Sequence, residues 1–284
     1  MDMNANDKNR IKGMLWGLIV GDAFGSPIQF SPKDRHSWIT EMEPCPVFNL
    51  PAGYWTDDGS MAMCVMDSFI RQGGYDLKDI GATFVRWWRD GYLSSVEGQS
   101  FDIGFATSTA CRAIARGSLV NGHEDSQGNG SIIRFAPSYV IARALKRPEI
   151  IHAVSDLTHA SQAVREVCDR FAAIVDEHLA GSRTAAKSEY ATREQVNNSG
   201  WAVSTLEAAL WAFNTTTTFE DGLIAAVNLG GDSDSIGAVY GQLAGAYYGF
   251  DSIPARWVEA VKEWRKVDDL IERFLAQVNE AEAV

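Results

Sequence analysis

Apolar residues recur at intervals of three and four along almost the whole chain, which is the spacing that places them on one face of an α-helix. The segments with this pattern, which are predicted to be helical, are residues 10–24, 60–72, 77–90, 104–117, 131–146, 160–181, 201–213, 219–229, 235–248 and 255–280. Strict alternation of apolar and polar residues, the pattern of a half-buried β-strand, is almost absent. The sequence therefore predicts an all-α fold.

The connections between these helices hold many of the turn-forming residues. The longest predicted connections cover residues 25–55 and 118–130, and the polar segment 182–200 is expected to be a mobile excursion on the surface. Strong helical patterns resume after each connection, so none of them resembles a linker between domains, and no internal repeat is present. We therefore expect a single compact domain over residues 1–284.

Charge and composition narrow the class of protein. The 284 residues include 37 acidic and 25 basic ones without a block of Lys or Arg, so no nucleic-acid surface is expected. The polar opening lacks the apolar run of a signal peptide, and no later stretch is apolar enough to span a membrane, which predicts a cytoplasmic protein without membrane contact. The four cysteines have no C-x-x-C spacing and are expected to be reduced core thiols.

Two clusters of hydroxyl and carboxylate side chains precede apolar, small-residue helices, one early and one late in the chain. The clusters are Thr56, Asp57 and Asp58, and Asp232, Asp234 and Ser235. Taken singly, each is typical of a helix N-terminus, where carboxylates favour the free N–H groups. Helices rich in small residues can pack closely and bring the clusters face to face. Four carboxylates in one partly dehydrated place repel one another unless cations lie between them, and oxygen ligands suit Mg²⁺, Mn²⁺ or Ca²⁺. The pair of clusters predicts a two-metal site.

Seven short blocks, taken in order, carry a resemblance to a known family. They are GDAFGSP at 21–27, WTDD at 55–58, FDIG at 101–104, GNGSIIR at 128–134, LTH at 157–159, SGW at 199–201 and NLGGDSDSIGAVYGQLAGAYYG at 228–249. From about residue 12 to about residue 265 the sequence resembles the ADP-ribosylglycohydrolase family, of the dinitrogenase-reductase-activating type. The resemblance implies an orthogonal multi-helix bundle with two divalent metal ions, Mg²⁺ or Mn²⁺, held by the six residues of the two clusters. It also implies hydrolysis of the bond between ADP-ribose and an acceptor.

Further blocks are candidates for binding the substrate. A loop such as GNGS is, taken alone, typical of an ordinary capped turn, but one that leaves N–H groups free at a helix N-terminus can bind a diphosphate. The resemblance implies that this block binds ADP-ribose through Gly128, Asn129, Gly130 and Ser131. A lone histidine is typical of a satisfied structural residue, and the resemblance instead places His159 near the nucleotide. Arg134 has two interpretations, a phosphate ligand or a structural ion-pair partner.

Four residues are the catalytic candidates: Asp58, Asp102, Asp232 and Gln29. Asp102 could cap the following helix, and the resemblance implies that it faces the scissile end of the substrate, where it binds the acceptor or steers a proton. Gln29 stands where the family often has a glutamate. Because an amide accepts no proton at neutral pH, this exchange requires another base or a slow reaction. Ser235 replaces the usual threonine and keeps the ligating oxygen.

The expected mechanism is metal-assisted displacement at the anomeric carbon of the ribose, through a transition state with oxocarbenium character. Asp58 and Asp232 are candidates for relaying the proton of the attacking water. An aspartate on the acceptor side suits a guanidinium leaving group, so the expected reaction is removal of mono-ADP-ribose from protein arginine. The expected partner is an ADP-ribosylated protein or a small-molecule substrate.

Rival function classes were weighed against this one. A terpenoid-synthase-like enzyme requires D-D-x-x-D on one helical face, whereas Asp57 and Asp58 are followed by Gly59, Ser60 and Met61. A catalytically impaired relative, with its glutamine marking lost chemistry, would bind ADP-ribose or occlude a partner such as an ADP-ribosyltransferase toxin. A hydrolysis assay with and without metal separates the enzyme from the binding protein.

Overall fold

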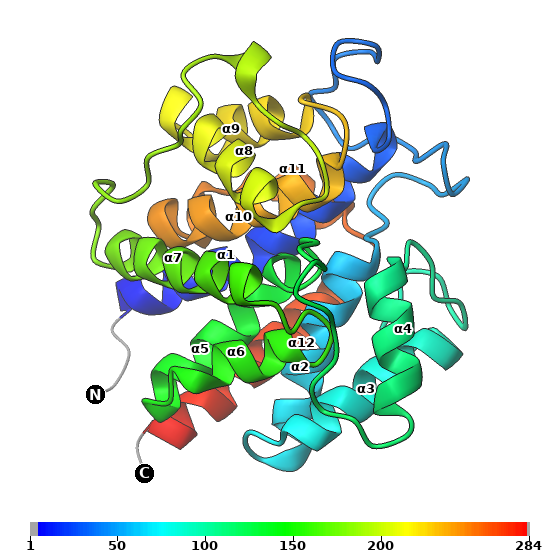
Figure 1. Cartoon of the computed structure of the whole chain (residues 1–284). Helices are drawn as coiled ribbons and strands as arrows, with labels where there is room; N and C mark the ends of the chain where they lie inside the picture. Colours follow the sequence, from blue (N-terminus) through cyan, green and yellow to red (C-terminus); the bar gives the residue numbers. More distant parts are fainter. Residues whose placement is uncertain (1–4, 283–284) are drawn as a thin grey trace.

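The structure, a computed structural model, describes residues 5–282, which are mostly helical (Figure 1). The α-helices are α1 (Ala5–Gly25), α2 (Asp57–Gln72), α3 (Leu77–Asp90), α4 (Phe105–Ile114), α5 (Phe135–Leu145), α6 (Glu149–Asp156), α7 (Gln162–Leu179), α8 (Ala202–Thr215), α9 (Phe219–Val227), α10 (Ser233–Tyr248), α11 (Ala255–Ala260) and α12 (Trp264–Glu282). The 3₁₀ turns are η1 (Ser26–Ile28), η2 (Ile132–Arg134), η3 (Arg193–Gln195) and η4 (Phe250–Ser252). Residues 5–282 contain isolated β-bridges but no β-strand, so the all-α prediction is confirmed.

Capping residues explain why some predicted helices match the observed ones closely. α3 has its predicted bounds because the Asp76 carboxylate accepts hydrogen bonds from Lys78 N at 2.9 Å and Asp79 N at 3.1 Å, and Gly91 ends the helix in the left-handed conformation. Gly73 ends α2 in the same way. These residues are local signals, so they can be read before the fold is known.

Two parts of the helical prediction were wrong. α6 was missed because its eight residues are too few to establish a period. The segment 255–280, expected as one helix, is two helices, α11 and α12. The chain bends between them, where Lys262 N donates to Gly53 O at 2.9 Å and Glu263 adopts a positive φ of 51°. A contact with a residue about 200 positions earlier therefore decides the break.

The polar segment 182–200 is attached to α8 rather than free on the surface. Ala186 within it is buried, and the buried Glu207 of α8 accepts hydrogen bonds from Ser188 Oγ at 3.0 Å and Glu189 N at 2.7 Å. All four cysteines are buried and free, as expected for reduced core thiols. Among the helices of residues 5–282, none is long and apolar enough to cross a membrane.

α1 and α10 cross at the centre of the molecule with their backbones in contact (Figure 1). The glycines at the crossing recur every four residues and are Gly13, Gly17 and Gly21 on α1 and Gly237, Gly241 and Gly245 on α10. A Cβ atom on Gly17 would lie 2.1 Å from Gly241 O, and one on Gly241 would lie 1.9 Å from Gly17 O. No side chain fits at these positions, so glycine is required there by close approach of the two backbones.

This helix pair positions the two acidic clusters. α1 carries Asp22 next to the crossing, and α10 begins with the second cluster at its N-terminus. α2, which begins with the first cluster, packs against α3 and α12 and also touches α1 and α10, while α8 and α9 cover the other side of α10 (Figure 1). The N-termini of α2 and α10 consequently face one pocket, although about 175 residues separate them along the chain.

Candidate active site

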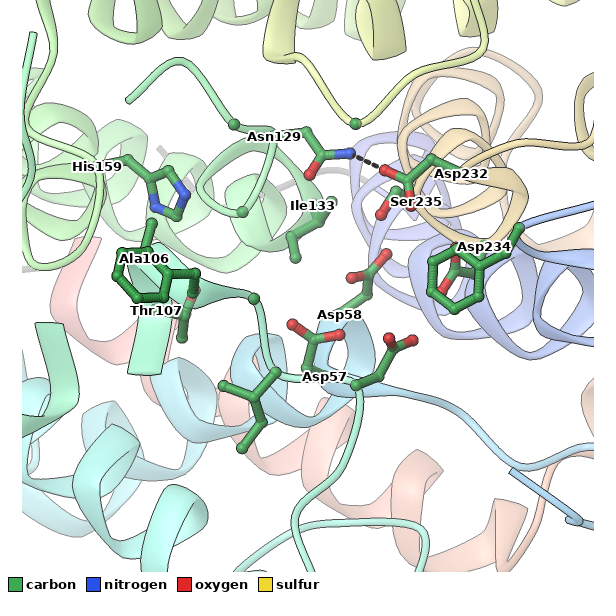
Figure 2. A pocket seen from close by; sticks show the side chains of 18 residues that line it. Asp57, Asp58, Ala106, Thr107, Asn129, Ile133, His159, Asp232, Asp234 and Ser235 are labelled. Atoms are coloured by element: carbon green, nitrogen blue, oxygen red, sulfur yellow. Dashed lines mark hydrogen bonds between the residues drawn. The ribbon is translucent and has the colours of Figure 1, made fainter. Parts of the chain in front are cut away.

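A pocket of about 510 Å³ opens where α2, α4 and α10 begin (Figure 2). Its wall includes the carboxylates of Asp57, Asp58, Asp102, Asp232 and Asp234, and the hydroxyl of Ser235. In Figure 2, Asp57 and Asp58 of the first cluster lie on one side of this space and Asp232, Asp234 and Ser235 of the second lie on another. The structure thus brings the two predicted clusters together.

Thr56 stands at the N-cap position of α2, but its side chain does not cap the helix. Instead, Asp22 of α1 accepts hydrogen bonds from Thr56 N at 2.9 Å, Thr56 Oγ1 at 2.9 Å and Gly59 N at 2.8 Å. A carboxylate from another helix thereby satisfies N–H groups that α2 leaves free. The Thr56 hydroxyl is buried outside the pocket wall, and because it donates its proton to Asp22 it keeps its oxygen lone pairs.

Asp22 is a site residue that the sequence reasoning missed. It lies inside the apolar run LIVGDAFG, and a carboxylate in such a run is a signal in itself, because a fully buried aspartate almost always has a structural or chemical partner. Burial raises the pKa of Asp22 to about 7, and the hydrogen bonds from Thr56 and Gly59 oppose that rise. Asp22 therefore links α1 to the N-terminus of α2.

The second cluster is held in place by an amide. Asn129 Nδ2 donates to Asp232 Oδ2 at 2.5 Å and to Thr205 Oγ1 at 3.0 Å (Figure 2). Asn129 was expected to bind substrate, and in this structure its side chain orients a carboxylate. Asp232 is the N-cap residue of α10, without a side-chain cap, so its carboxylate is directed to the pocket rather than to its own helix.

Burial dominates the electrostatics of these carboxylates. It raises the pKa of Asp57, Asp58 and Asp234 well above the ordinary value, and the negative charges of the neighbouring aspartates raise it further. The pKa of Asp102 and that of Asp232 are also raised, again mainly by burial, although the hydrogen bond from Asn129 opposes the rise at Asp232. No Lys or Arg lines the pocket, so the wall itself supplies no compensating cation.

The donor atoms in the pocket have the chemistry of a hard-cation site. Asp58 Oδ2 and Asp234 Oδ1 are buried and have no hydrogen-bond partner, which is costly for an anionic oxygen unless a cation or proton is present. All the candidate ligands are oxygens, as Mg²⁺ and Mn²⁺ prefer. In the described residues, however, no group of three or more His, Cys, Asp or Glu side chains is arranged to hold a metal ion. The carboxylates surround the pocket but do not converge on one point.

Asp102 lies beside the carboxylate of Asp234, and Gln29 is in contact with Asp102. Asp102 does not cap α4, whose N-cap residue is Gly104, and it has a positive φ of 59°, a strained conformation for a residue other than glycine. Gln29 is 2% exposed and lies outside the pocket wall. Burial raises the pKa of Asp102, and Asp234 and then Gln29 oppose this rise. Neither polar atom of Gln29 forms a hydrogen bond of regular geometry, so its contact with Asp102 is not a well-formed bond.

The GNGS block lines the pocket except for its last residue. Gly128, Asn129 and Gly130 are in the wall, whereas Ser131 is buried behind it, with its hydroxyl 3.8 Å from the Cys168 Sγ of α7. Ser131 was also a candidate for binding substrate, and in this structure the 3₁₀ turn that follows it directs its side chain into the core. Periodicity does not reveal the direction of a side chain in so short a turn.

His159 lies against this loop with a defined proton position. Arg134 Nη2 donates to Thr158 Oγ1 at 2.5 Å, and Thr158 Oγ1 lies 2.7 Å from His159 Nδ1. Because arginine has only donors, the Thr158 hydroxyl accepts from it and is left with its own proton to give to Nδ1, an arrangement in which the imidazole proton is on Nε2; we assign this tautomer to His159. Burial lowers the pKa of His159 to about 3, which keeps the ring neutral. Its Nε2–H group lies beside Gly128 and Gly130.

Arg134 supports the loop from inside the protein. It is 1% exposed, donates to Gly130 O and Thr158 Oγ1, and lies 5.0 Å from the Phe84 ring. Both interpretations of Arg134, as a phosphate ligand and as an ion-pair partner, were wrong, since its partners are carbonyl and hydroxyl oxygens. Burial lowers the pKa of this guanidinium to about 10, which still leaves it charged at neutral pH.

The family model described as ADP-ribosylglycohydrolase matches residues 3–283. The chain belongs to the ADP-ribosylglycohydrolase family. It is 36% identical to the ADP-ribosylarginine hydrolase Tri1 of Pseudomonas putida (strain GB-1), an alignment that covers 97% of this chain and 81% of the relative. It is 28% identical to the ADP-ribosyl-[dinitrogen reductase] glycohydrolase of Rhodospirillum rubrum, with 93% and 92% covered. A solved ADP-ribosylglycohydrolase-related protein complex shares the fold at a TM-score of 0.82 and 32% identity, over 97% of this chain and 100% of that one.

Most of the site residues predicted from the sequence of this ADP-ribosylglycohydrolase line the pocket. The structure gathers ten predicted residues in one wall: Asp57, Asp58, Asp102, Gly128, Asn129, Gly130, His159, Asp232, Asp234 and Ser235. It leaves Thr56, Gln29 and Ser131 behind the wall.

Proposed function

We propose that this ADP-ribosylglycohydrolase removes ADP-ribose from arginine side chains of proteins with the help of two divalent cations, Mg²⁺ or Mn²⁺. The observation that carries the proposal is the pocket in which buried carboxylates of α2 and α10 face one another with no cationic side chain in the wall. The names of two relatives, an ADP-ribosylarginine hydrolase and an ADP-ribosyl-[dinitrogen reductase] glycohydrolase, support the choice of ADP-ribosylated protein and of arginine.

The proposed metal ligands are Thr56, Asp57, Asp58, Asp232, Asp234 and Ser235. The partnerless oxygens of Asp58 and Asp234 are the atoms best placed to accept a cation. When bound, the cations would supply charge that polarises the ribose hydroxyls and lowers the pKa of an attacking water. Cations between these carboxylates would also offset their mutual repulsion.

The remaining chemistry belongs to the protein's own side chains. We assign to Asp58 and Asp232 the relay of the proton released by the attacking water. Asp102 lines the same pocket beside Asp234, and we assign to its carboxylate the binding of the guanidinium of the leaving arginine by two parallel hydrogen bonds. The amide of Gln29 takes no proton at neutral pH, so we assign it no role as a base. Its role in this proposal is to orient the Asp102 carboxylate toward the leaving group through their contact.

The ADP-ribose itself is proposed to lie along the loop that contains Gly128 and Gly130. A Cβ on Gly130 would lie 2.5 Å from His159 Cε1, so glycine allows the imidazole to pack directly on the backbone. The Nε2–H group of the neutral His159 can then donate to a diphosphate oxygen. A neutral donor with a fixed proton position binds the anion through geometry rather than charge.

Thr158→Val is expected to weaken ADP-ribose binding about tenfold, because it removes the hydroxyl that fixes the His159 proton and a charge-assisted bond is worth about 1.5 kcal/mol. The effect should appear in KM and in the Kd of ADP-ribose, with kcat changed little. Nuclear magnetic resonance of the labelled imidazole nitrogens would follow the proton directly. Thr158→Ser, which keeps the hydroxyl, serves as the control. Equal affinities in Val and Ser variants would show that the proton position does not matter.

The function is tested by incubating the enzyme with ADP-ribosylarginine, ADP-ribosylserine and ADP-ribosylated protein, in Mg²⁺, Mn²⁺ and EDTA, and measuring released ADP-ribose. We expect faster release from arginine than from serine, and none in EDTA. Asp102→Asn is expected to remove most of the arginine preference. A serine preference in the wild-type enzyme would contradict the assignment of Asp102, and full activity in EDTA would contradict the metals.

A second candidate function is binding of ADP-ribose without turnover, with a toxin or other ADP-ribosyltransferase as a partner. It is favoured by Gln29, an amide where relatives often carry a glutamate, and by the aromatic side chains Phe30 and Phe105 at the mouth of the pocket, which are 63% and 85% exposed. If wild-type protein binds ADP-ribose but releases none from any acceptor, and Gln29→Glu restores release, the binding function is correct.

A further inference from the structure

Cationic side chains gather on α3, on α4 and in the turn that follows α4, although the formal net charge of the chain is −12. They are Lys78, Arg86, Arg89, Arg112 and Arg116, all of them exposed. Residues 77–90 and 105–116 hold only two of the chain's 37 acidic residues, Asp79 and Asp90. The local charge of this face is therefore opposite to that of the rest of the molecule.

These five cations lack carboxylate partners. None of them forms an ion pair within the described part of the chain. Asp79, one of the two acidic residues of this face, forms an ion pair with Arg71 at 2.7 Å instead. Arg86 lies 3.5 Å from the Tyr92 ring instead. The guanidinium groups of Arg89 and Arg112 both lie 5.7 Å from the ring of Trp88, so two like charges share one aromatic side chain. An anion between them would relieve their repulsion.

A groove of about 520 Å³ runs between the two helices. Its wall consists of Lys78, Ala82, Val85, Arg89, Ile114, Ala115, Gly117 and Leu119, without an acidic residue. Ala82, Val85 and Leu119 give it an apolar floor, and Lys78 and Arg89 add charge. The complementary occupant carries carboxylates together with short apolar side chains, as an acidic, leucine-containing protein segment does.

We infer that this groove is the docking site for such an acidic segment of the ADP-ribosylated protein, an inference that rests on the proposed function. α4 connects the two sites, since Phe105 at its start lines the active pocket and Ile114 at its end lines the groove. At about 1.5 Å per helical residue these two residues are about 14 Å apart, a span that about four extended residues cover. A protein whose modified arginine enters the pocket thus lays its flanking residues along α4.

The test compares three substrates: ADP-ribosylarginine, an ADP-ribosylated arginine peptide with a Glu- and Leu-containing segment beginning about four residues away, and the same peptide with Gln in place of Glu. We expect the KM of the wild-type enzyme for the acidic peptide to be about tenfold below that for the neutral one, and the difference to shrink in salt. Arg89→Glu with Arg112→Glu should abolish it and leave turnover of ADP-ribosylarginine within twofold.

The matched control is Arg265→Glu with Arg273→Glu, the same charge change on two exposed residues of α12. Equal KM values for both peptides in the wild-type enzyme, or an equal loss in the α12 control, would overturn the docking site. Direct binding of the unmodified acidic peptide, followed by fluorescence anisotropy, keeps this test separate from the reaction. If ADP-ribosylarginine is not hydrolysed at all, the proposed function fails, while anisotropy still decides whether the groove binds acidic peptide.

Discussion

Asp234→Asn is expected to melt at a higher temperature than the wild-type protein in EDTA and at a lower temperature in Mg²⁺. Without cations, a buried carboxylate beside other carboxylates destabilises the fold by about 1 kcal/mol or more, and the amide removes that charge. With cations, the wild-type protein gains about 2.7 kcal/mol at a metal concentration one hundred times Kd, which the variant loses with its ligand. Scanning calorimetry in EDTA and in Mg²⁺ measures both melting temperatures and shows whether the difference between variant and wild type changes sign.

The same variant is expected to lose at least about a thousandfold in kcat/KM, since a metal-held charge supplies several kcal/mol to the transition state. Asp251→Asn, an exposed aspartate in η4, is the control and should behave as the wild type does in both assays. A variant that melts like the wild type in EDTA and in Mg²⁺ alike would remove Asp234 from the metal site.

Gly241→Ala is expected to destabilise the protein by about 3 kcal/mol or more, although alanine is favoured over glycine in a helix by about 1 kcal/mol. The new methyl group would meet the backbone oxygen of Gly17 at 1.9 Å, and a backbone cannot rotate aside as a side chain can. The helices must then separate, which also displaces Asp22 and Asp234. Urea denaturation measures the loss of stability, and activity at low temperature measures the displacement.

Gly81→Ala on α3 is the matched control for this prediction. Its Cβ would lie 3.0 Å or more from side-chain atoms of Ile114 and Leu157, which can shift. We expect a change of less than about 1 kcal/mol there. Similar losses in both variants would mean that glycine is needed in these helices for another reason than the close crossing of α1 and α10.

Local patterns were enough to predict the helical fold and the pairing of the acidic clusters. Apolar periodicity, the N-cap Asp76 and the C-cap glycines are readable within one segment, and they place α3 at its observed bounds. The prediction of a cation site rests on a further argument: two carboxylate clusters brought together by small-residue helices require positive charge to offset their repulsion. The comparisons confirm the family and the helical fold and leave the metal and the residue roles as proposals.

What the sequence could not supply depends on contacts between distant segments. Asp22 is the clearest case, because its role as a cap for α2 exists only once α1 lies beside Thr56 and Gly59. The inward direction of Ser131 and the contacts of Arg134 with carbonyl oxygens are set by the short turn between them. Each of these side chains is polar and buried, so composition alone leaves its partner undetermined.

The repeated glycines of α1 and α10 also affect how the chain folds. Because they recur every four residues on both helices, sliding α10 by four residues, about 6 Å, would set Gly17 against Gly245 instead of Gly241, so glycine would again face glycine. The glycines thus select which faces meet but not the register. Register depends on polar contacts at the end of the crossing, such as the bond from Ser233 Oγ to Gly25 O at 2.8 Å. If α1 and α10 first pack in the shifted register, they must separate before the native contacts can form. We therefore expect the polar contacts beside the pocket to select the register of the two helices during folding.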